Sequence, residues 1–519
     1  MPDDGDARYV LAVDLGTGGP KVGLVSTRGE LAAREHVAVA TRRLPDGGAV
    51  QDAGEWWEVV RAATRRLVGS GSVDPARIVA VSCTGQWAST VPVDAAGVPV
   101  GDCLLWLDTR GGRHTRAAIG GPVQGYAPGA LLRWIRHTAG VPSLSGADPV
   151  GHMLALEHDL PEVAAAARWY LEPVDYLTMR FCGVAAATHA SMAGAWLTDN
   201  RDLATLAYDP ALVAAAGVPG RKLPALVPFG TVVGDVLAAV ADDLGLPPGV
   251  AVVAGTPDLH SAAAGSGAVL EHQAHLTLST SSWVSCPVAA KKTDGLHQIA
   301  TVPGLSDRTY LVADNHDTGG RALEWAGDTL FAGPRPAYEE LTALAATVAP
   351  GAGGVVFTPW LAGERSPVAD PHARGGFHNL SLRTTTPELL RAVLEGVAFN
   401  SRWLTEAVER FVGRRLPELR MLGGGATSAR WCQIHADVLD RTVVQVADPV
   451  YANLRGAALL AGLALGDLDA HEVRGSVPVA GTFHPDPATR ATYDHRFAEF
   501  PRLYRAQKGL FRRLNHLAG

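Results

Sequence analysis

The stretch VLAVDLGTGGPKVGLV, residues 10–25, decides the fold class of this chain. Apolar residues alternate on both sides of a glycine-rich turn, which predicts the two strands of a β-hairpin. The first strand ends on Asp14, and Lys21 opens the second. Gly16 and Thr17 begin a turn of bare backbone N–H groups, and such turns suit phosphate oxygens.

Asp14 and Lys21 have a chemical use if a polyphosphate lies at this turn. The Asp14 carboxylate could hold Mg²⁺, directly or through water, because magnesium takes one or two protein carboxylates beside phosphates. The Lys21 ammonium could neutralise phosphate charge. The alternative is an ordinary hairpin whose aspartate only caps its turn.

The composition indicates a globular protein of two domains. The chain has 519 residues, 47% of them apolar and 19% charged, which is too long for one ordinary core. A net charge of −7 gives no reason to expect nucleic acid as a partner, so a small molecule is the expected ligand.

The five cysteines are far apart and show neither disulfide nor zinc spacing, which favours a reducing cytoplasm. No apolar run reaches the length of a membrane span, and the acidic N-terminus does not resemble a signal peptide. We expect residues 1–7 to form a disordered tail.

Strand and helix patterns alternate along the chain, which predicts an α/β fold. The stretch AHLTLSTSSWVSCPV, residues 274–288, again reads strand, small-residue turn, strand, and Ser279, Thr280 and Ser281 occupy its turn. Two such hairpins predict two similar domains, residues 8–257 and 258–505, that face each other across a cleft. A chance similarity between two hairpins is the alternative.

Asp258 follows a buried-looking strand in VAVVAGTPDLH and stands at the start of a helix. At the carboxyl end of a strand it could accept the proton of a hydroxyl that attacks phosphorus. The alternative is a helix cap. Two other caps are expected, Asp52 before the helix in GEWWEVVRAATRRLV and Thr386 before the helix in PELLRAVLEGVAF.

Two further patterns suit ligands. Gly423, Gly424 and Gly425 lie between a strand and a helix in LRMLGGGATSARWCQ, where backbone can approach a ligand closely, although the pattern is not a dinucleotide fingerprint. Polar and aromatic residues also follow strands, which suits a polyhydroxylated substrate. These are Gln86, Trp87, Trp106, Asp108 and Arg110. A ligand-free turn, a surface salt bridge or a core tryptophan would explain each of them instead.

Together these motifs resemble the FGGY carbohydrate kinases along nearly the whole chain. GERSPVADPHARGGFHNL, residues 363–380, looks like the family signature, and GGGATSARWCQ follows its nucleotide-site pattern G-G-G-A-x-S-x-x-W-x-Q. The first hairpin matches the phosphate motif D-x-G-T-x-x-x-K. The resemblance implies an actin-like ATPase fold, with two ribonuclease-H-like domains and ATP and a sugar in the central cleft.

The resemblance also implies roles for residues. Asp258 would be the general base, and Asp14 would organise Mg²⁺ and the phosphates. The ATP contacts would come from Gly16, Thr17, Lys21, Ser279, Thr280, Ser281, Gly424, Gly425, Ala426 and Ser428.

Within the family, GQW and WLDTR look most like the sugar-binding segments G-Q-M-H-G and W-x-D-x-R of xylulokinases. Trp87 departs from that pattern, and so does Leu259, which stands where xylulokinases have asparagine after the catalytic aspartate. Ser279 and Ser282 replace the glycines of the usual second phosphate turn G-T-S-G.

The expected activity is ATP-dependent phosphorylation of a ketopentose or a related polyol, with ribulose, a pentitol or gluconate as other acceptors. A catalytically weak sensor of sugar or nucleotide and an actin-like ATPase that acts on proteins are the alternatives. The resemblance allows a homodimer.

Overall fold

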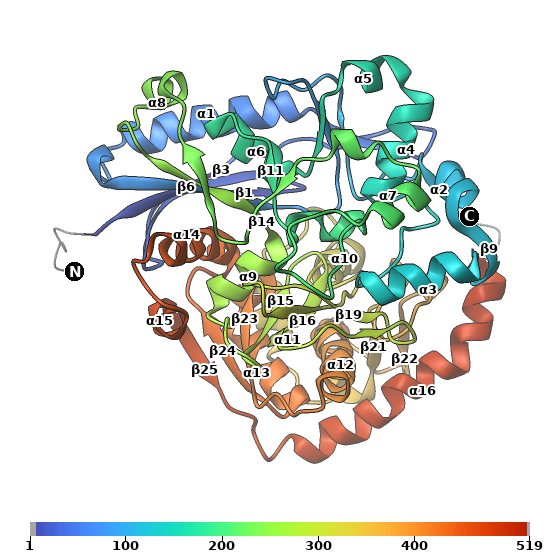
Figure 1. Ribbon diagram of the computed structural model, residues 1–519. Helices are drawn as coiled ribbons and strands as arrows, with labels where there is room; N and C mark the ends of the chain where they lie inside the picture. The colour runs from blue at the N-terminus through green and yellow to red at the C-terminus, as the bar shows by residue number, and fades with distance from the viewer. Residues whose placement is uncertain (1–6, 516–519) are drawn as a thin grey trace.

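The computed structural model describes residues 7–515 and arranges them as two lobes, each built on one β-sheet (Figure 1). The predicted tail lies outside the described residues except for Ala7. Within residues 7–515, the helices are all too short or too polar to cross a membrane.

The N-terminal lobe contains a six-stranded sheet in the order β13-β14-β6-β1-β2-β3. The predicted hairpin forms strands β1 and β2, with Asp14 opposite Lys21. Strands β6 and β14 continue the sheet in parallel to β1, and β13 closes its edge antiparallel. The bounds are β1 Tyr9–Gly16, β2 Gly19–Ser26, β3 Leu31–His36, β6 Ile78–Gly85, β13 Val232–Asp235 and β14 Ala251–Pro257.

The C-terminal lobe repeats this order in five strands, β16-β15-β23-β24-β25. The hairpin β15–β16 is again followed by two parallel strands and an antiparallel edge strand. The bounds are β15 Ala274–Leu278, β16 Ser282–Ser285, β23 Glu418–Leu422, β24 Thr442–Val446 and β25 Val479–Phe483. The duplication predicted from the two hairpins is therefore confirmed, and so is the actin-like fold that the resemblance implies.

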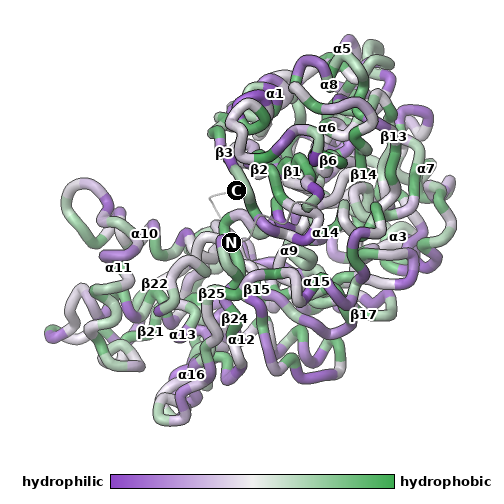
Figure 2. Tube along the Cα trace, turned by 90° about the vertical axis from the view of Figure 1, so that its left-hand side faces the viewer, coloured by the Kyte–Doolittle hydropathy of each residue, from purple (hydrophilic) through white to green (hydrophobic). Residues whose placement is uncertain are grey.

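Apolar helix faces cover the sheets, because alternate residues of each strand point to either face. In the N-terminal lobe, α1 (Ala53–Gly69) and α6 (Pro173–Cys182) share a core with β1, β2 and β6. In the C-terminal lobe, α12 (Thr386–Val412) and α13 (Ala429–Leu439) pack on Leu276 and Leu278 of β15. Figure 2 shows hydrophobic segments gathered around β1 and β2 of the first sheet.

The two lobes meet where helices α9 (Asp258–Ser266) and α14 (Ala452–Leu465) cross. Each helix follows the second parallel partner of its hairpin, β14 or β24, so the two occupy equivalent places in the repeat. A Cβ on Gly265 would lie 1.8 Å from the carbonyl oxygen of Ala452, and one on Gly456 would lie 1.8 Å from that of Ser261. The absence of side chains at these glycines lets the helix backbones touch.

One helix cap is confirmed and one is corrected. Asp52 caps α1 by accepting hydrogen bonds from the N–H groups of Gly54 and Glu55. The cap of α12 is Thr385, one residue before the predicted Thr386. Glu388 decides the position, because its carboxylate reaches back to the Thr385 N–H at 2.7 Å and completes a capping box.

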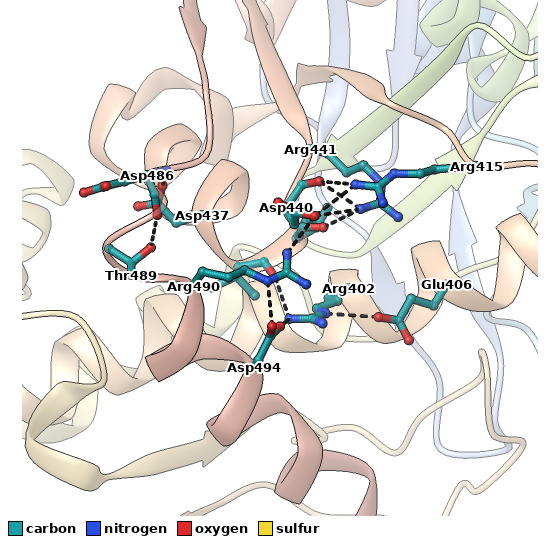
Figure 3. Close-up of polar contacts among 12 residues, drawn as sticks. Arg402, Glu406, Arg415, Asp437, Asp440, Arg441, Asp486, Thr489, Arg490 and Asp494 are labelled. Atoms are coloured by element: carbon teal, nitrogen blue, oxygen red, sulfur yellow. Dashed lines mark hydrogen bonds and ion pairs between the residues drawn. The ribbon is translucent and has the colours of Figure 1, made fainter.

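The long helix α16 (Arg490–Asn515) runs along the outside of the C-terminal lobe (Figure 1). It continues past residue 505, the predicted end of the C-terminal domain. Figure 3 shows how ion pairs hold its first turns, with Asp494 between Arg402 of α12 at 2.8 Å and Arg490 at 2.6 Å.

The remaining helices and strands are divided between the two lobes. Those of the N-terminal lobe are β4 Arg42–Arg43, β5 Ala49–Gln51, β7 Val91–Val93, β8 Cys103–Leu104, α2 Gly112–Ile119, β9 Gly120–Val123, α3 Pro128–His137, α4 Pro149–Asp159, α5 Pro161–Ala166, β10 Trp169–Leu171, β11 Ala186–Ala187, α7 Pro210–Ala216, β12 Ala225–Leu226 and α8 Ala238–Leu244. Those of the C-terminal lobe are β17 Pro287–Val288, β18 Thr293–Asp294, β19 Ile299–Pro303, β20 Tyr310–Ala313, α10 Arg321–Leu330, α11 Tyr338–Ala345, β21 Val356–Thr358, β22 Gly376–His378 and α15 Ala470–Ser476.

Candidate active site

Asp14 and Lys21 face each other across the first hairpin. The Lys21 ammonium donates to Asp14 Oδ2 at 2.9 Å, and the Asp14 side chain is almost fully buried. The negative charge of Asp14 raises the pKa of Lys21 above its usual value, and burial opposes this effect. Lys21 therefore remains protonated beside the glycine turn, with its charge paired to Asp14.

Asp258 is the first residue of α9, directly after β14 ends. Pro257 occupies the N-cap position, so Asp258 does not cap the helix, and its Oδ1 accepts the N–H of Leu259 at 2.7 Å. Burial, and after it the charge of Asp14, raises the pKa of Asp258 to about 7, while Lys21 opposes the shift. A carboxylate with this pKa is suited to exchange a proton near neutral pH.

A hydrogen-bonded group lies beside the turn. The Thr17 hydroxyl donates to Gln86 Oε1 at 3.2 Å and accepts the indole N–H of Trp106 at 3.2 Å. Gln51, which sequence reasoning missed, joins the group by donating to the Thr17 carbonyl at 2.9 Å and accepting from Trp56. The available signal was a polar residue that ends the apolar stretch Ala49-Val50 just before the Asp52 cap.

The other predicted sugar-side residues form their hydrogen bonds with residues outside this group. Asp108 is fully buried and takes its hydrogen bonds from the Ala49 N–H and the Arg110 guanidinium, at 3.0 and 2.7 Å. The Arg110 guanidinium is therefore already paired with the Asp108 carboxylate. The Trp87 indole N–H donates to the Ser191 carbonyl at 2.9 Å. A ligand could therefore contact the face of the Trp87 ring but not its N–H group.

The second hairpin turn leaves its side chains accessible. Ser279 and Ser281 are half-buried and Thr280 is exposed, and in residues 7–515 their hydroxyls have no hydrogen-bond partner. The N–H groups of Gly319 and Gly320 donate to the Thr280 and Ser279 carbonyls at 2.8 and 2.6 Å. Sequence reasoning missed this glycine pair, which opens α10 in the pattern DTGGRALEW.

The glycine turn after β23 lies against the second hairpin. Gly423 has a φ of +90°, and a Cβ there would lie 2.6 Å from the Ser279 hydroxyl oxygen. Gly424 is open, whereas a Cβ on Gly425 would lie 2.4 Å from the side chain of Leu278. Gln445 fixes the turn by donating to the Ala426 carbonyl at 2.6 Å.

Ser428 caps α13 by accepting the Trp431 N–H at 3.2 Å. The N-terminus of this helix thus directly follows the glycine turn, with its partial positive charge at that end. Ser428 therefore shapes the turn whether or not it contacts a ligand.

The stretch that looks like the family signature, residues 363–380, supports the turn of the second hairpin through Glu364. Glu364 is buried and accepts hydrogen bonds from Asn400 Nδ2 at 2.6 Å and from the Asp317 N–H at 3.3 Å. Burial raises the pKa of Glu364 to about 8. Because Asp317 leads into Gly319 and Gly320, Glu364 positions the loop that touches the second hairpin.

The predicted residues therefore fall into three groups. Asp14, Lys21 and Asp258 interact electrostatically beside the Thr17 group, and the second hairpin adjoins the glycine turn. The segment 449–451 connects the two groups, because Gly423 donates to the Pro449 carbonyl and Tyr451 lies close enough to influence Lys21. Asp108 and Arg110 form the third group.

Comparison with known proteins agrees with this arrangement. The model of the N-terminal domain of the FGGY family of carbohydrate kinases matches residues 9–265, and that of the C-terminal domain matches residues 277–465. A xylulose kinase of Staphylococcus epidermidis is 28% identical over 511 residues, which cover 96% of this chain and 97% of the relative. A gluconokinase of Bacillus licheniformis is 25% identical, with 94% and 93% covered.

Among solved structures, a gluconate kinase from Lactobacillus acidophilus shares the fold with a TM-score of 0.86 at 22% identity, covering 98% of this chain and all of the other. The two matched domain models together span most of the chain and correspond to its two sheets. The chain belongs to the FGGY family of carbohydrate kinases, which are phosphotransferases that act on a sugar hydroxyl.

Proposed function

We propose that the chain transfers the γ-phosphoryl group of ATP to a hydroxyl of a ketopentose or a related polyol, as a xylulokinase does. The observation that carries the proposal is Asp258, a carboxylate with a pKa of about 7 beside the Asp14–Lys21 pair. Asp258 accepts the hydroxyl proton while the hydroxyl oxygen forms its bond to the γ-phosphorus. The bond from that phosphorus to the β-phosphate oxygen breaks, and ADP leaves.

The two hairpin turns would bind the phosphates from opposite lobes. Gly16, Thr17 and Lys21 supply backbone N–H groups and one positive charge. Ser279, Thr280 and Ser281 supply hydroxyls without a partner in the described residues, and of these Ser279 stands where the family pattern has glycine. Phosphoryl transfer requires positioning and charge neutralisation more than covalent catalysis by the protein. The two turns and Lys21 would provide both.

Asp14 fits a magnesium ion. Its Oδ2 accepts from Lys21, and no hydrogen bond from the described part of the chain reaches Oδ1. A free carboxylate oxygen beside phosphates is the kind of ligand that Mg²⁺ takes. Asp14 would hold the ion directly or through water, and the ion would neutralise phosphate charge. Gly424, Gly425, Ala426 and Ser428 would line the adenosine side.

The acceptor side favours a neutral sugar over an aldonate. Gln86, Trp106 and Thr17 offer polar atoms for hydroxyl groups, and Trp87 offers a ring face. An aldonate such as gluconate calls for a free cation, but Arg110 is already paired with the buried Asp108. The relatives carry both substrate names, and the occupied Arg110 supports the ketopentose.

The test is ADP release with Mg-ATP against ketopentoses, deoxy-ketoses, pentitols, glycerol and gluconate, for the wild type and Asp258→Asn. We expect one strong neutral acceptor whose turnover Asp258→Asn reduces by at least 1,000-fold while binding persists. Asp307→Asn, a change at an exposed loop residue, is the matched control and should keep full activity. Sugar binding without turnover by the wild type would instead establish a sensor.

A further inference from the structure

Two residues beside the reacting groups are apolar where a polyhydroxylated acceptor calls for polar atoms. Trp87 directly follows Gln86, and Leu259 directly follows Asp258. Both belong to one apolar cluster, although they are 172 positions apart in the chain. We call it the tryptophan cluster, and its members are Trp87, Ala139, Ala193, Trp196, Leu259, Ala263, Trp283, Ala300, Val302, Leu305, Leu311 and Ala313.

The tryptophan cluster draws on both lobes. Trp87 and Trp196 come from the N-terminal lobe, Leu259 lies on α9, and Trp283 lies on β16 directly after the second phosphate turn. The cluster therefore borders the first turn through Gln86, the base through Leu259 and the second turn through Trp283. Because Leu259 directly follows Asp258, a molecule whose hydroxyl reaches Asp258 would lie close to this cluster.

The cluster offers mainly hydrocarbon to that molecule, because the N–H groups of Trp87, Trp196 and Leu259 are already bonded. The Trp87 indole N–H donates to the Ser191 carbonyl, and that of Trp196 donates to Asp148 at 3.2 Å. The Leu259 side chain is 6% exposed, and its N–H is bonded to Asp258. Within residues 7–515, the indole N–H of Trp283 is the one side-chain donor of the cluster without a partner.

A hydroxyl pressed against Trp87 and Leu259 loses its hydrogen bonds to water and gains none from these two residues. A carbon that bears only hydrogen has no such cost and gains contact with the rings. The polar atoms for the remaining hydroxyls would come from the hydrogen-bonded group of Gln86, Thr17 and Trp106.

We propose that the acceptor of this kinase is a deoxygenated sugar or polyol, with a CH₂ or CH₃ carbon held against Trp87 and Leu259. The inference rests on the proposed function and narrows its substrate class. Discrimination by an apolar pocket is limited, so we expect a preference of about 10- to 100-fold in kcat/KM over the hydroxylated counterpart.

The test uses matched acceptors, xylulose and ribulose with their 1-deoxy and 3-deoxy derivatives. We expect one deoxy derivative to exceed its parent at least tenfold in kcat/KM. Leu259→Asn and Trp87→His each introduce a polar atom into the cluster and should shift that ratio at least tenfold toward the parent. Leu132→Asn makes the same change as Leu259→Asn at an exposed residue of α3 and should leave the ratio unchanged.

Calorimetric binding of the same pairs to Asp258→Asn gives the preference without turnover. If sugars are phosphorylated but the parents are preferred, or if Leu259→Asn and Trp87→His leave the ratio unchanged, this inference fails and the proposed function stands. If the wild type phosphorylates none of them and the deoxy preference appears in binding, the proposed function fails and the apolar subsite stands. Equal binding of parent and derivative overturns the inference in either case.

Discussion

Asp258 determines the expected pH dependence of the reaction. Its carboxyl must be ionised to accept a proton, and burial together with Asp14 raises its pKa to about 7. We therefore expect kcat/KM to fall about tenfold per pH unit below pH 7 and to level off above it. Lys21→Met should move the inflection to higher pH, because Lys21 favours the ionised carboxylate. A flat profile between pH 5 and 8 would contradict the role of Asp258.

The same group links stability to pH. The folded-state pKa of Asp258 is about 7 against a usual value of 3.8, so the folded protein retains a proton that the unfolded chain has lost. The stabilisation is complete below about pH 4 and is lost as the pH rises through 7. Asp258→Asn should therefore gain melting temperature relative to the wild type as the pH rises from 4.5 to 7.5. Asp307→Asn should show no such trend, and a constant difference for Asp258→Asn would refute the linkage.

Residues at strand ends were predictable, because a charge that interrupts an apolar alternation is visible in the sequence. Asp14 and Asp258 were found in this way. Gln51 was not, because its role depends on Thr17 and Gln86, which lie 34 and 35 positions away. The pairing of Asp108 with Arg110 is local, but the burial that makes Asp108 inaccessible depends on strand β5.

At the level of elements, both hairpins were predictable and their turns were less so. The first hairpin pairs Gly16 with Gly19, leaving two residues in the turn, whereas the second pairs Leu278 with Ser282 and leaves three. The extra residue gives the second turn room for serines at positions where the resemblance suggests glycine. The cap of α12 was also hard to predict, because Thr385 and Thr386 are adjacent. Only the contact that Glu388 makes shows which of the two is the cap.

The crossing of α9 and α14 makes a strong prediction for Gly456→Ala. The added methyl would lie 1.8 Å from the Ser261 carbonyl oxygen, so the helices must separate, and we expect the free energy of unfolding to fall by about 3 kcal/mol. Chemical denaturation measures the change. Gly475→Ala is the matched control, because it lies in helix α15 with nothing within 4 Å of the added Cβ and should be neutral or slightly stabilising. Equal effects of the two changes would show that the close approach of the helices is unimportant.

At the scale of the whole molecule, the repeated hairpin predicted two similar lobes but not how they are joined. Helix α14 belongs to the second repeat by sequence, yet Leu454, Ala457, Ala458 and Ala461 pack against Val10, Ala12 and Val25 of the first sheet. This contact links residues more than 400 positions apart, and no local pattern records it. The interface between lobes is therefore the part of the fold that the sequence left open.

Arg455 makes a buried hydrogen bond between the lobes at this interface. The residue is 2% exposed, and its guanidinium donates to the Gly29 carbonyl of the N-terminal lobe at 3.1 Å and to the Ala447 carbonyl of the C-terminal lobe at 2.9 Å. Arg455→Met keeps most of the side-chain volume and leaves both carbonyls without this donor. We expect a loss of about 2 kcal/mol or more, because unpaired buried carbonyls are costly.

Because the lost bond to Gly29 joins the two lobes, their unfolding should also become less cooperative. Differential scanning calorimetry should resolve two transitions in Arg455→Met, whereas we expect a single transition for the wild type. The matched control is Arg34→Met, whose ion pair with Asp448 at 3.1 Å crosses the same interface but is exposed on both sides. An exposed pair contributes at most about 1 kcal/mol, so the control should keep a single transition. If Arg34→Met and Arg455→Met behave alike, the coupling lies in the packing of α9 and α14 rather than in the buried guanidinium.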